Sequence, residues 1–227
     1  MSQSIPSHSA LLTNLFQDLS GTWLLNRKLQ SADSSAPSGR CSGTATFTTR
    51  APSPVLDADG KLHIAHAELL YHEQGEFEVI KAVGNNLASV PTFTFARKYI
   101  WRLQRTENAV TISIWFTKPG TETIDYLFHK IDLPFDNDPD SQSDHRLVLH
   151  GTGGHLCVED FYNSFYSFTM SRSDPSLPLT LSSWTTVHEV LGPKKDQHIE
   201  TTFVRPEQAR LIPTLEAPYL NDSSIEQ

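Results

Sequence analysis

The stretch Leu19-Ser20-Gly21-Thr22-Trp23-Leu24-Leu25-Asn26-Arg27 decides the fold, because the hydrophobic period changes within it. Over residues 9–19, four leucines and a phenylalanine recur at intervals of three to four residues, which predicts a short amphipathic helix. Ser20-Gly21 ends that helix. From residue 22 onward apolar and polar residues alternate, as they do in half-buried strands. The sequence therefore predicts one helix in front of an all-β body.

About ten antiparallel strands are expected after the helix, and they favour a closed barrel over a sandwich because a barrel has no exposed edges. Gly75 is expected to form a bulge or a bend, and residues 151–154 (Gly-Thr-Gly-Gly) a flexible connection. The expected strands are 22–30, 41–49, 67–81, 93–105, 109–118, 123–133, 146–150, 155–158, 161–171, 179–191 and 198–205, with long loops at 31–39, 51–60 and 135–144.

Residues 206–211 are predicted to form a helical turn that is followed by a polar tail. Neither an internal repeat nor a break in composition divides the sequence. We therefore expect a single domain over residues 1–227, with an N-terminal helix at 9–19, a barrel at 20–205 and a C-terminal extension at 206–227.

Composition and charge exclude several classes of function. The 227 residues carry a formal net charge of −8, which does not attract a polyphosphate, so nucleic-acid binding is not expected. The two cysteines, Cys41 and Cys157, do not make a disulfide framework. The N-terminal region has no secretory signal, and no apolar run is long enough to span a membrane. We therefore expect a cytoplasmic protein with reduced thiols and no membrane partner.

Alternate residues of a barrel strand face the interior, and here the apolar faces carry a few ionisable groups. Arg27, Glu73, Arg97 and His188 each lie in a row of large apolar or aromatic residues. A buried charge is costly unless it is paired. One interpretation is that Glu73 forms a structural ion pair with Arg97 or Arg27. The other is a ligand pocket with apolar walls and a few convergent polar groups.

The inward rows supply the candidate site residues. As catalytic groups we expect hydrogen-bond donors that would bind a developing negative charge, and a carboxyl or imidazole that would move a proton. These are Arg97, Tyr99, Tyr71, Glu73 and His155. Aromatic walls would hold the ligand. The ligand-binding residues expected are Trp101, Phe116, Tyr162, Tyr166, Trp184 and His188.

The remaining motifs predict neither a metal site nor a catalytic nucleophile. His63, His66 and His72 lack the ligand spacing of known metal sites, so no metal is expected. His155 and Cys157 are two residues apart, but no third group orients them as a catalytic pair. The turn at residues 192–196 (Gly-Pro-Lys-Lys-Asp) is either a solvated hairpin or a place where a lysine at the barrel mouth meets an anionic group of a ligand.

Gly21-Thr22-Trp23 resembles the Gly-x-Trp opening of lipocalins and other calycins. The resemblance implies a calycin-like antiparallel barrel with a short helix at each end, in which a late arginine packs over the tryptophan. Arg205 is expected to fill that role.

The sequence also resembles a calycin-like family of unknown function found as small bacterial and fungal proteins. This resemblance supports a fold and implies no established activity. Gln197 departs from the aromatic residue expected there. The matching stretches are residues 19–27, 39–47, 68–75, 97–101, 155–162 and 192–205.

A looser similarity connects this chain with small fungal calycin-like barrels that catalyse pericyclic ring closures, including hetero-Diels–Alder reactions. The similarity rests on size, acidity and an aromatic lumen, and is an analogy of fold. It implies a cofactor-free cyclase of secondary metabolism that acts on an apolar or aromatic intermediate, with or without a preceding dehydration. The alternative is a non-catalytic carrier of a lipophilic small molecule. A third possibility is a filled lumen and an outer surface that serves a partner protein. The oligomeric state stays open.

Overall fold

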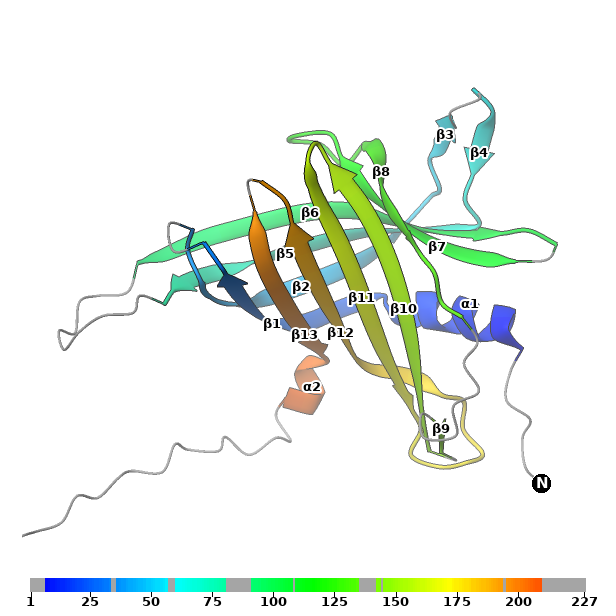
Figure 1. Cartoon of the computed structure of the whole chain (residues 1–227). Coiled ribbons are helices and arrows are strands. Elements are labelled where there is room, and N and C mark those ends of the chain that lie inside the picture. The colour runs from blue at the N-terminus through cyan, green and yellow to red at the C-terminus, as the bar shows by residue number, and fades with distance from the viewer. Residues whose placement is uncertain are drawn as a thin grey trace, which may run out of the picture.

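A computed structural model of the chain describes residues 7–33, 36–56, 60–80, 91–107, 109–134, 142–143, 145–193 and 195–209. Within these residues one eleven-stranded antiparallel sheet forms the body of the molecule (Figure 1). Its strands are β1 (Gly21–Ser31), β2 (Gly39–Arg50), β5 (Ala67–Val79), β6 (Thr92–Arg105), β7 (Val110–Thr117), β8 (Ile124–Ile131), β9 (Gln142–Ser143), β10 (Arg146–Cys157), β11 (Asp160–Ser171), β12 (Thr180–Leu191) and β13 (Asp196–Val204). A separate hairpin pairs β3 (Pro54–Leu56) with β4 (Leu62–Ile64), and the helices are α1 (His8–Asp18) and α2 (Pro206–Ala209).

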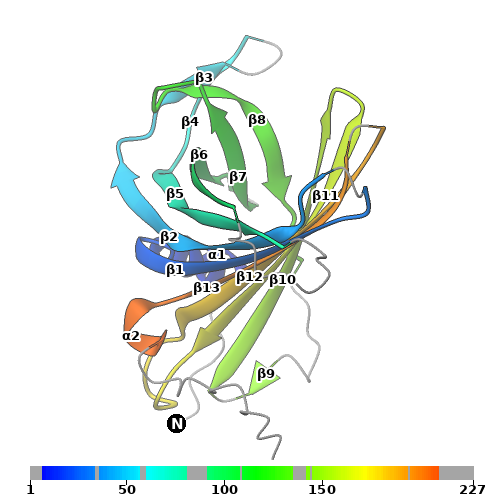
Figure 2. The same cartoon turned by 90° about the vertical axis from the view of Figure 1, so that its left-hand side faces the viewer.

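The large sheet runs in the order β8-β7-β6-β5-β2-β1-β13-β12-β11-β10-β9. Every neighbouring pair is antiparallel. In Figure 2 the strands β5 to β8 curl round on one side of β1, and β10 to β13 lie on the other. Without the two-residue β9, ten strands form a nearly closed barrel. The predicted all-β antiparallel barrel of about ten strands, with short helices at both ends, is confirmed.

The seam between β8 and β10 closes the barrel through a single backbone bridge. Asp132 and Thr152 exchange two hydrogen bonds of 2.8 Å each. Beside the bridge, side chains of the β8 side pack directly on the β10 backbone. A Cβ atom on Gly151 would lie 2.8 Å from side-chain atoms of Ile131 and Leu133. The glycines therefore make room for the seam. The expectation of a flexible connection at residues 151–154 was wrong, because β10 runs unbroken through them.

Helix α1 covers one end of the barrel with a leucine-rich face. Leu11, Leu12, Leu15 and Phe16 are all buried, and the helix contacts β7 and β12. The strand β1 starts at this end, directly after the helix, so the tips of the hairpins β1–β2, β10–β11 and β12–β13 lie at the opposite end. That opposite end is the mouth of the barrel.

The Gly-x-Trp stretch at the closed end has the packing that the resemblance implied. The Trp23 indole donates to the Leu19 carbonyl at 2.8 Å, which ties the strand to the end of the helix. The Arg205 guanidinium lies 3.7 Å from the centroid of the Trp23 ring. It also donates to the carbonyls of Asp18 and Thr22. The expected place of Arg205 over Trp23 is confirmed.

The structure differs from several local expectations. Of the bulge or bend expected at Gly75, the bulge is absent, because Gly75 pairs in register with Gly43 on β2 and Phe95 on β6. A Cβ atom on Gly75 would lie 2.2 Å from the Ser42 carbonyl oxygen, so glycine is needed here for the close approach of two strands. The loop expected at residues 51–60 contains strand β3. Of the loop expected at 135–144, residues 142–143 form β9, and the rest lies outside the described residues, as do Lys81, Lys194 and residues 210–227.

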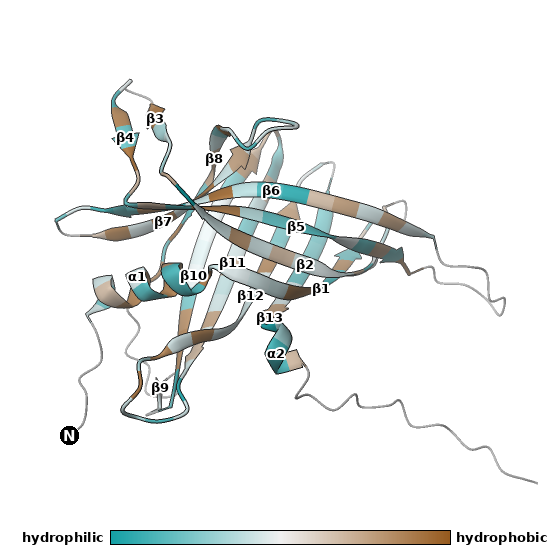
Figure 3. Ribbon diagram, turned by 180° about the vertical axis from the view of Figure 1, so that it is seen from behind, coloured by the Kyte–Doolittle hydropathy of each residue, from teal (hydrophilic) through white to brown (hydrophobic). Residues whose placement is uncertain are grey.

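The core follows the predicted inward faces. Figure 3 shows hydrophobic and hydrophilic residues alternating along the strands. Aromatic rings fill the lower lumen, where the Trp184 and Phe203 rings stack with centroids 3.6 Å apart. Cys41 and Cys157 are free thiols, as predicted. None of the described helices has the length and apolarity needed to cross a membrane.

Candidate functional site

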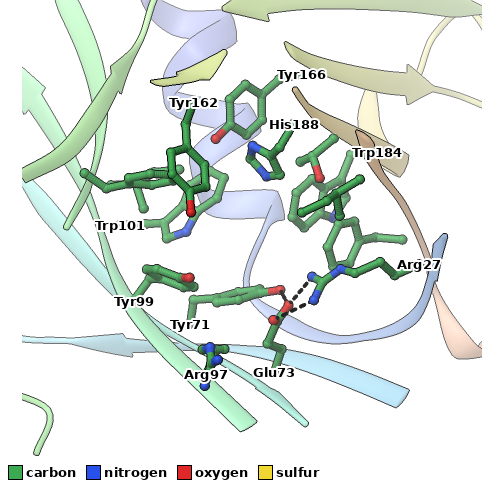
Figure 4. A pocket seen from close by; sticks show the side chains of 15 residues that line it. Arg27, Tyr71, Glu73, Arg97, Tyr99, Trp101, Tyr162, Tyr166, Trp184 and His188 are labelled. Carbon is green, nitrogen blue, oxygen red and sulfur yellow. Dashed lines mark hydrogen bonds and ion pairs between the residues drawn. The ribbon is translucent and has the colours of Figure 1, made fainter. Parts of the chain in front are cut away.

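The upper half of the barrel holds a half-open cavity of about 190 Å³ (Figure 4). Its floor is formed by the aromatic rings that fill the lumen beneath it, among them Trp101, Trp184 and Phe203. A cavity of about 150 Å³ accepts a benzene molecule, so this one accommodates a compact ring system. The lining residues are Arg27, Tyr71, Glu73, Arg97, Tyr99, Trp101, Ile114, Phe128, Tyr162, Tyr166, Trp184, Thr186, His188, Ile199 and Phe203.

An ion pair between Arg27 and Glu73 lies on one wall of this cavity. The two Nη atoms of Arg27 donate to the two carboxylate oxygens of Glu73 at 3.0 and 2.7 Å, and Arg27 Nε donates to Thr201 Oγ1 at 2.9 Å. The Tyr71 hydroxyl donates to Glu73 Oε2 at 2.6 Å. Burial and the neighbouring carboxylate raise the pKa of Tyr71 well above its usual value. The Arg27 and Tyr71 hydrogen bonds together engage both carboxylate oxygens of Glu73.

The choice of Arg27 as partner follows from the strand that separates it from Glu73. Between them, β2 presents only small inward residues, Cys41, Gly43 and Ala45, so the long arginine side chain can cross over this strand. Arg97 stands directly opposite Glu73 in the β5–β6 register, yet it makes no ion pair with it among the described residues. Of the two partners that the sequence left open, the structure selects Arg27.

Arg97 and Tyr99 lie on the rim and upper wall. Arg97 is exposed, and its hydrogen bond among the described residues goes to the Ala96 carbonyl at 3.2 Å. The Tyr99 ring packs 6.0 Å from Tyr71 and 5.7 Å from Phe116, measured between centroids. Burial raises the pKa of Tyr99 to about 12, so its hydroxyl keeps its proton at neutral pH. Both side chains present hydrogen-bond donors to the cavity.

Two histidines are held neutral, His188 in the cavity wall and His129 behind the lining residue Tyr166. His188 Nδ1 lies 2.8 Å from the buried Ser164 hydroxyl, and His129 Nε2 lies 2.6 Å from the Tyr166 hydroxyl. Burial lowers the pKa of His188 to about 4 and that of His129 to about 3. Gly153 makes this packing possible, because a Cβ atom there would lie 2.5 Å from the His129 ring.

A lysine stands at the mouth. Lys195 Nζ donates to the Tyr162 hydroxyl at 2.8 Å and lies 5.5 Å from the centre of that ring. Lys195 belongs to the turn between β12 and β13, so this turn brings a positive charge to the edge of the cavity. Lys195 is exposed and is not among the lining residues, so the solvated hairpin and the contact with an anionic ligand group both stay predictions.

Phe116 and His155 do not line the cavity. They belong to an aromatic cluster beside it, where β8 and β10 meet. His155 packs against Phe116, Phe128 and Tyr162, with centroid distances of 5.8, 5.2 and 6.4 Å. Partial burial lowers the pKa of His155. The other predicted site residues, nine in all, line the cavity together: Tyr71, Glu73, Arg97, Tyr99, Trp101, Tyr162, Tyr166, Trp184 and His188.

Sequence reasoning missed several groups. Phe128, Ile199 and Phe203 line the cavity from strands whose positions were predicted, and extending the alternation to residues 124–131 and 198–204 would have found them. It also missed a buried ion pair on the outer face, in which Glu68 bonds Arg102 at 3.2 Å.

The Glu68 pair is enclosed by the segment that carries the β3–β4 hairpin. Ser53 donates to Glu68 through its backbone and its hydroxyl, and Arg50 bonds Glu68 at 3.1 Å. Arg102 donates to the Ser53 carbonyl at 2.6 Å. Both charged side chains are almost fully buried and are bonded to protein groups, so this cluster fixes the segment to the barrel wall.

The barrel can be compared with known proteins once this geometry is in view. Residues 19–205 match the model of a family described as "Family of unknown function (DUF6314)". The chain belongs to this family. The matched stretch begins at Leu19, whose carbonyl binds Trp23, and ends at Arg205, which covers Trp23, so the DUF6314 match spans the whole barrel and its closed end.

The DUF6314 family carries no assigned activity. No curated protein and no solved structure gives a significant match to the chain. The described part of the chain contains no group of three or more metal-ligating side chains. The function has to be argued from the cavity itself.

Proposed function

We propose that this DUF6314 barrel is a cyclase that folds a compact conjugated molecule in its cavity and promotes a ring closure of the Diels–Alder or hetero-Diels–Alder type with its own side chains. The observation that carries the proposal is an aromatic cavity with fixed hydrogen-bond donors on its wall and rim. In such a reaction two σ bonds form at the expense of two π bonds, and no atom is lost.

The aromatic walls supply the first contribution, which is orientation. Trp101 and Trp184 form a floor against which a planar ligand packs, and Tyr99 and Tyr162 belong to the same lining (Figure 4). Holding diene and dienophile in a reactive pose contributes up to about 7–11 kcal/mol in favourable systems. The rings are fixed by contacts with one another, so the cavity keeps its shape without a ligand.

The donors supply the second contribution. A carbonyl oxygen of the dienophile or heterodiene gains negative charge as the ring closes, and a donor that is already in place lowers the barrier. Arg97 and Tyr99 are available for this role, because no other side chain among the described residues binds their donor groups. Removing one such donor is expected to slow the reaction by about 10²–10³-fold.

Ring closure fits this cavity better than a preceding dehydration. Glu73 is already bonded to Arg27 and Tyr71 through both of its carboxylate oxygens. His155 lies outside the lining residues. A pericyclic step needs neither group, since it transfers no proton.

The test is a stereochemical one. Synthetic compounds that carry a reactive diene tethered to an enone or an alkene, and that close slowly and without stereoselectivity in buffer, are incubated with the full chain. Chiral chromatography follows the rate and the enantiomeric excess of the product. We expect an accelerated reaction and an enantiomeric excess for compounds small enough for the cavity.

A matched pair of variants locates the effect. Ile199 lines the cavity, and its neighbour His198 is exposed on the same strand. Ile199→Trp fills the cavity and is expected to abolish the enantiomeric excess, whereas His198→Trp is expected to preserve it. Equal loss in both variants, or an excess that survives Ile199→Trp, would place the chemistry elsewhere and refute the proposal.

A non-catalytic carrier of a lipophilic small molecule is the second candidate. It is favoured by the electrostatics of the cavity wall, where the Arg27–Glu73 charges cancel and His188 is neutral. Arg97 distinguishes the two. In a cyclase, Arg97→Gln lowers kcat more than it raises KM, whereas in a carrier it weakens binding alone and no compound reacts faster.

Further parts of the proposal concern the setting. Free thiols at Cys41 and Cys157 are compatible with a reducing, cytoplasmic compartment. A place in fungal secondary metabolism and a kinship with calycins and pericyclases rest on the resemblance alone. Western blotting of cytosolic and secreted fractions tests the compartment, and a secreted protein would contradict it.

A further inference from the structure

Glu73 is the one carboxylate among the lining residues that the structure describes, and the other polar side chains of the lining all carry hydrogen-bond donors. The carboxylate of Glu73 is the main acceptor in the lining, and its oxygens already bind Arg27 and Tyr71. The Tyr71 proton is used in that bond. The hydrogen-bonding groups that remain available to a ligand therefore include those of His188, Tyr162 and Tyr99, together with Arg97 at the rim.

The buried Ser164 hydroxyl determines what His188 offers. Ser164 is fully buried, and among the described residues its side chain bonds His188 Nδ1. A buried hydroxyl needs an acceptor for its proton, so Ser164 donates and Nδ1 accepts. The remaining proton of the neutral imidazole is then on Nε2. His188 lines the cavity (Figure 4) and presents an N–H donor to it.

The two tyrosines near the mouth also present protons. The Tyr162 oxygen accepts from Lys195, which has no lone pair, so the Tyr162 proton is free for another acceptor. The Tyr99 hydroxyl stays protonated, because burial holds its pKa at about 12, and none of the described groups binds it. Both hydroxyls belong to residues of the lining.

The positive charge at the rim also favours a ligand that accepts hydrogen bonds. Among the described residues, no carboxylate lies within ion-pair distance of Arg97, although Glu73 stands opposite it in the strand register. Lys195 adds a second positive charge, with Asp160 in its neighbourhood. The whole chain is acidic, with a formal charge of −8. An uncompensated arginine beside a set of donors is therefore a local feature of this mouth.

We infer that the ligand is a compact conjugated or aromatic acid, whose anionic oxygen binds Arg97 at the rim while its ring lies on the tryptophan floor. This inference rests on the proposed function, for which it names the class of molecule. A carboxylate is an acceptor at both oxygens and matches a guanidinium in two parallel hydrogen bonds. A ligand whose polar end is only a donor would leave these groups without partners, which is costly in a partly buried site.

The experiment uses three probes with one carbon skeleton: trans-cinnamate, trans-cinnamyl alcohol and trans-β-methylstyrene. Isothermal titration calorimetry measures the affinity of each for the full chain. We expect cinnamate to bind at least tenfold more tightly than the alcohol. Arg97→Gln is expected to remove about tenfold from the affinity for cinnamate and to leave the hydrocarbon unaffected, and Arg97→Lys to recover part of the loss.

Lys98 provides the matched control. It follows Arg97 on the same strand, faces the outer side and pairs with Glu122 at 2.7 Å, so Lys98→Gln removes the same charge without touching the cavity. It is expected to leave the affinity for cinnamate unchanged.

The outcomes separate this inference from the proposed function. The inference that the ligand is an acid is refuted if the alcohol or the hydrocarbon binds as tightly as cinnamate. It is also refuted if Arg97→Gln and Lys98→Gln change the affinity for cinnamate equally. In both cases the cavity remains a binding site. If none of the three probes binds, the inference and the proposed function fail together.

Discussion

Breaking the Arg27–Glu73 pair is expected to destabilise the barrel more than any other single change at the site. Glu73→Gln keeps the shape of the side chain but leaves the Arg27 charge without its partner. The Glu73 side chain is 4% exposed and that of Arg27 is 20% exposed, so solvent cannot replace the lost bonds. Removing one partner of a buried pair costs about 3–5 kcal/mol.

That cost converts into a shift of the melting temperature. An unfolding entropy of about 2.1 cal/mol/K per residue over 227 residues amounts to about 0.48 kcal/mol/K. Dividing about 3–5 kcal/mol by this value predicts a fall of about 6–10 °C for Glu73→Gln. Differential scanning calorimetry measures it directly.

The control is an ion pair of the same kind at the surface. Glu122 binds Lys98 at 2.7 Å, but the side chain of Glu122 is exposed. Glu122→Gln is expected to leave the melting temperature unchanged, since solvent screens such pairs. Equal shifts in the two variants would refute the argument that burial makes the Arg27–Glu73 pair important. A Glu73→Gln protein as stable as the original would refute it as well.

Three further predictions concern the histidines, the seam and the closed end. Because burial lowers the folded-state pKa of His129 to about 3 and of His188 to about 4, the unfolded chain binds more protons below pH 6.5. The unfolding free energy should be constant above that pH and fall below it, by up to about 1.4 kcal/mol per pH unit for each histidine. Urea titrations at pH 7, 6 and 5 measure this change. A pH-independent midpoint of urea unfolding would contradict the prediction. Gly153→Ala should lower the melting temperature by about 2–6 °C through overpacking at the seam. Gly154→Ala should change it little, because the added Cβ atom would lie 3.1 Å from the tip of the Phe161 ring at the surface. Equal effects of the two variants would argue against a packed seam. Arg205→Ala should lower the melting temperature by about 2–4 °C, because it uncovers the indole at the closed end, and no change would show that this contact is not stabilising.

The fold could be predicted because its strands follow a strict period of two. The rows that begin at Trp23 and Leu69 were identified as inward-facing, and Trp23, Leu25, Leu69 and Tyr71 are buried in the structure. The ionisable groups Arg27 and Glu73 were found by the same argument, because each interrupts an apolar row. A charge that keeps the phase of an apolar row is therefore a useful signal of a lumen group.

The partner of Glu73 could not be chosen from the sequence. Arg27 and Glu73 lie on strands separated by β2, so their meeting depends on the register of three strands and on the small size of Cys41 and Ala45 between them. Neither property follows from the alternation within a single strand. Arg97, the direct register neighbour, would have been the natural choice and is not the partner.

The glycine-rich stretch at residues 151–154 was misinterpreted for a related reason. Gly151 and Gly153 look like flexible positions when only the sequence neighbours are considered. In the structure, Ile131, Leu133 and His129 from the other side of the seam occupy the space that side chains there would take. The reason for the glycines lies in a strand that is adjacent only after the barrel has closed.

The central claim is that the barrel cavity is a ligand site. A crystal structure of the chain with trans-cinnamate tests it most directly. We expect the aromatic ring of the probe between Tyr99 and the tryptophan floor, with the carboxylate within hydrogen-bond distance of the Arg97 guanidinium. Electron density for the probe only on the outer surface, with the cavity filled by protein side chains, would contradict the claim.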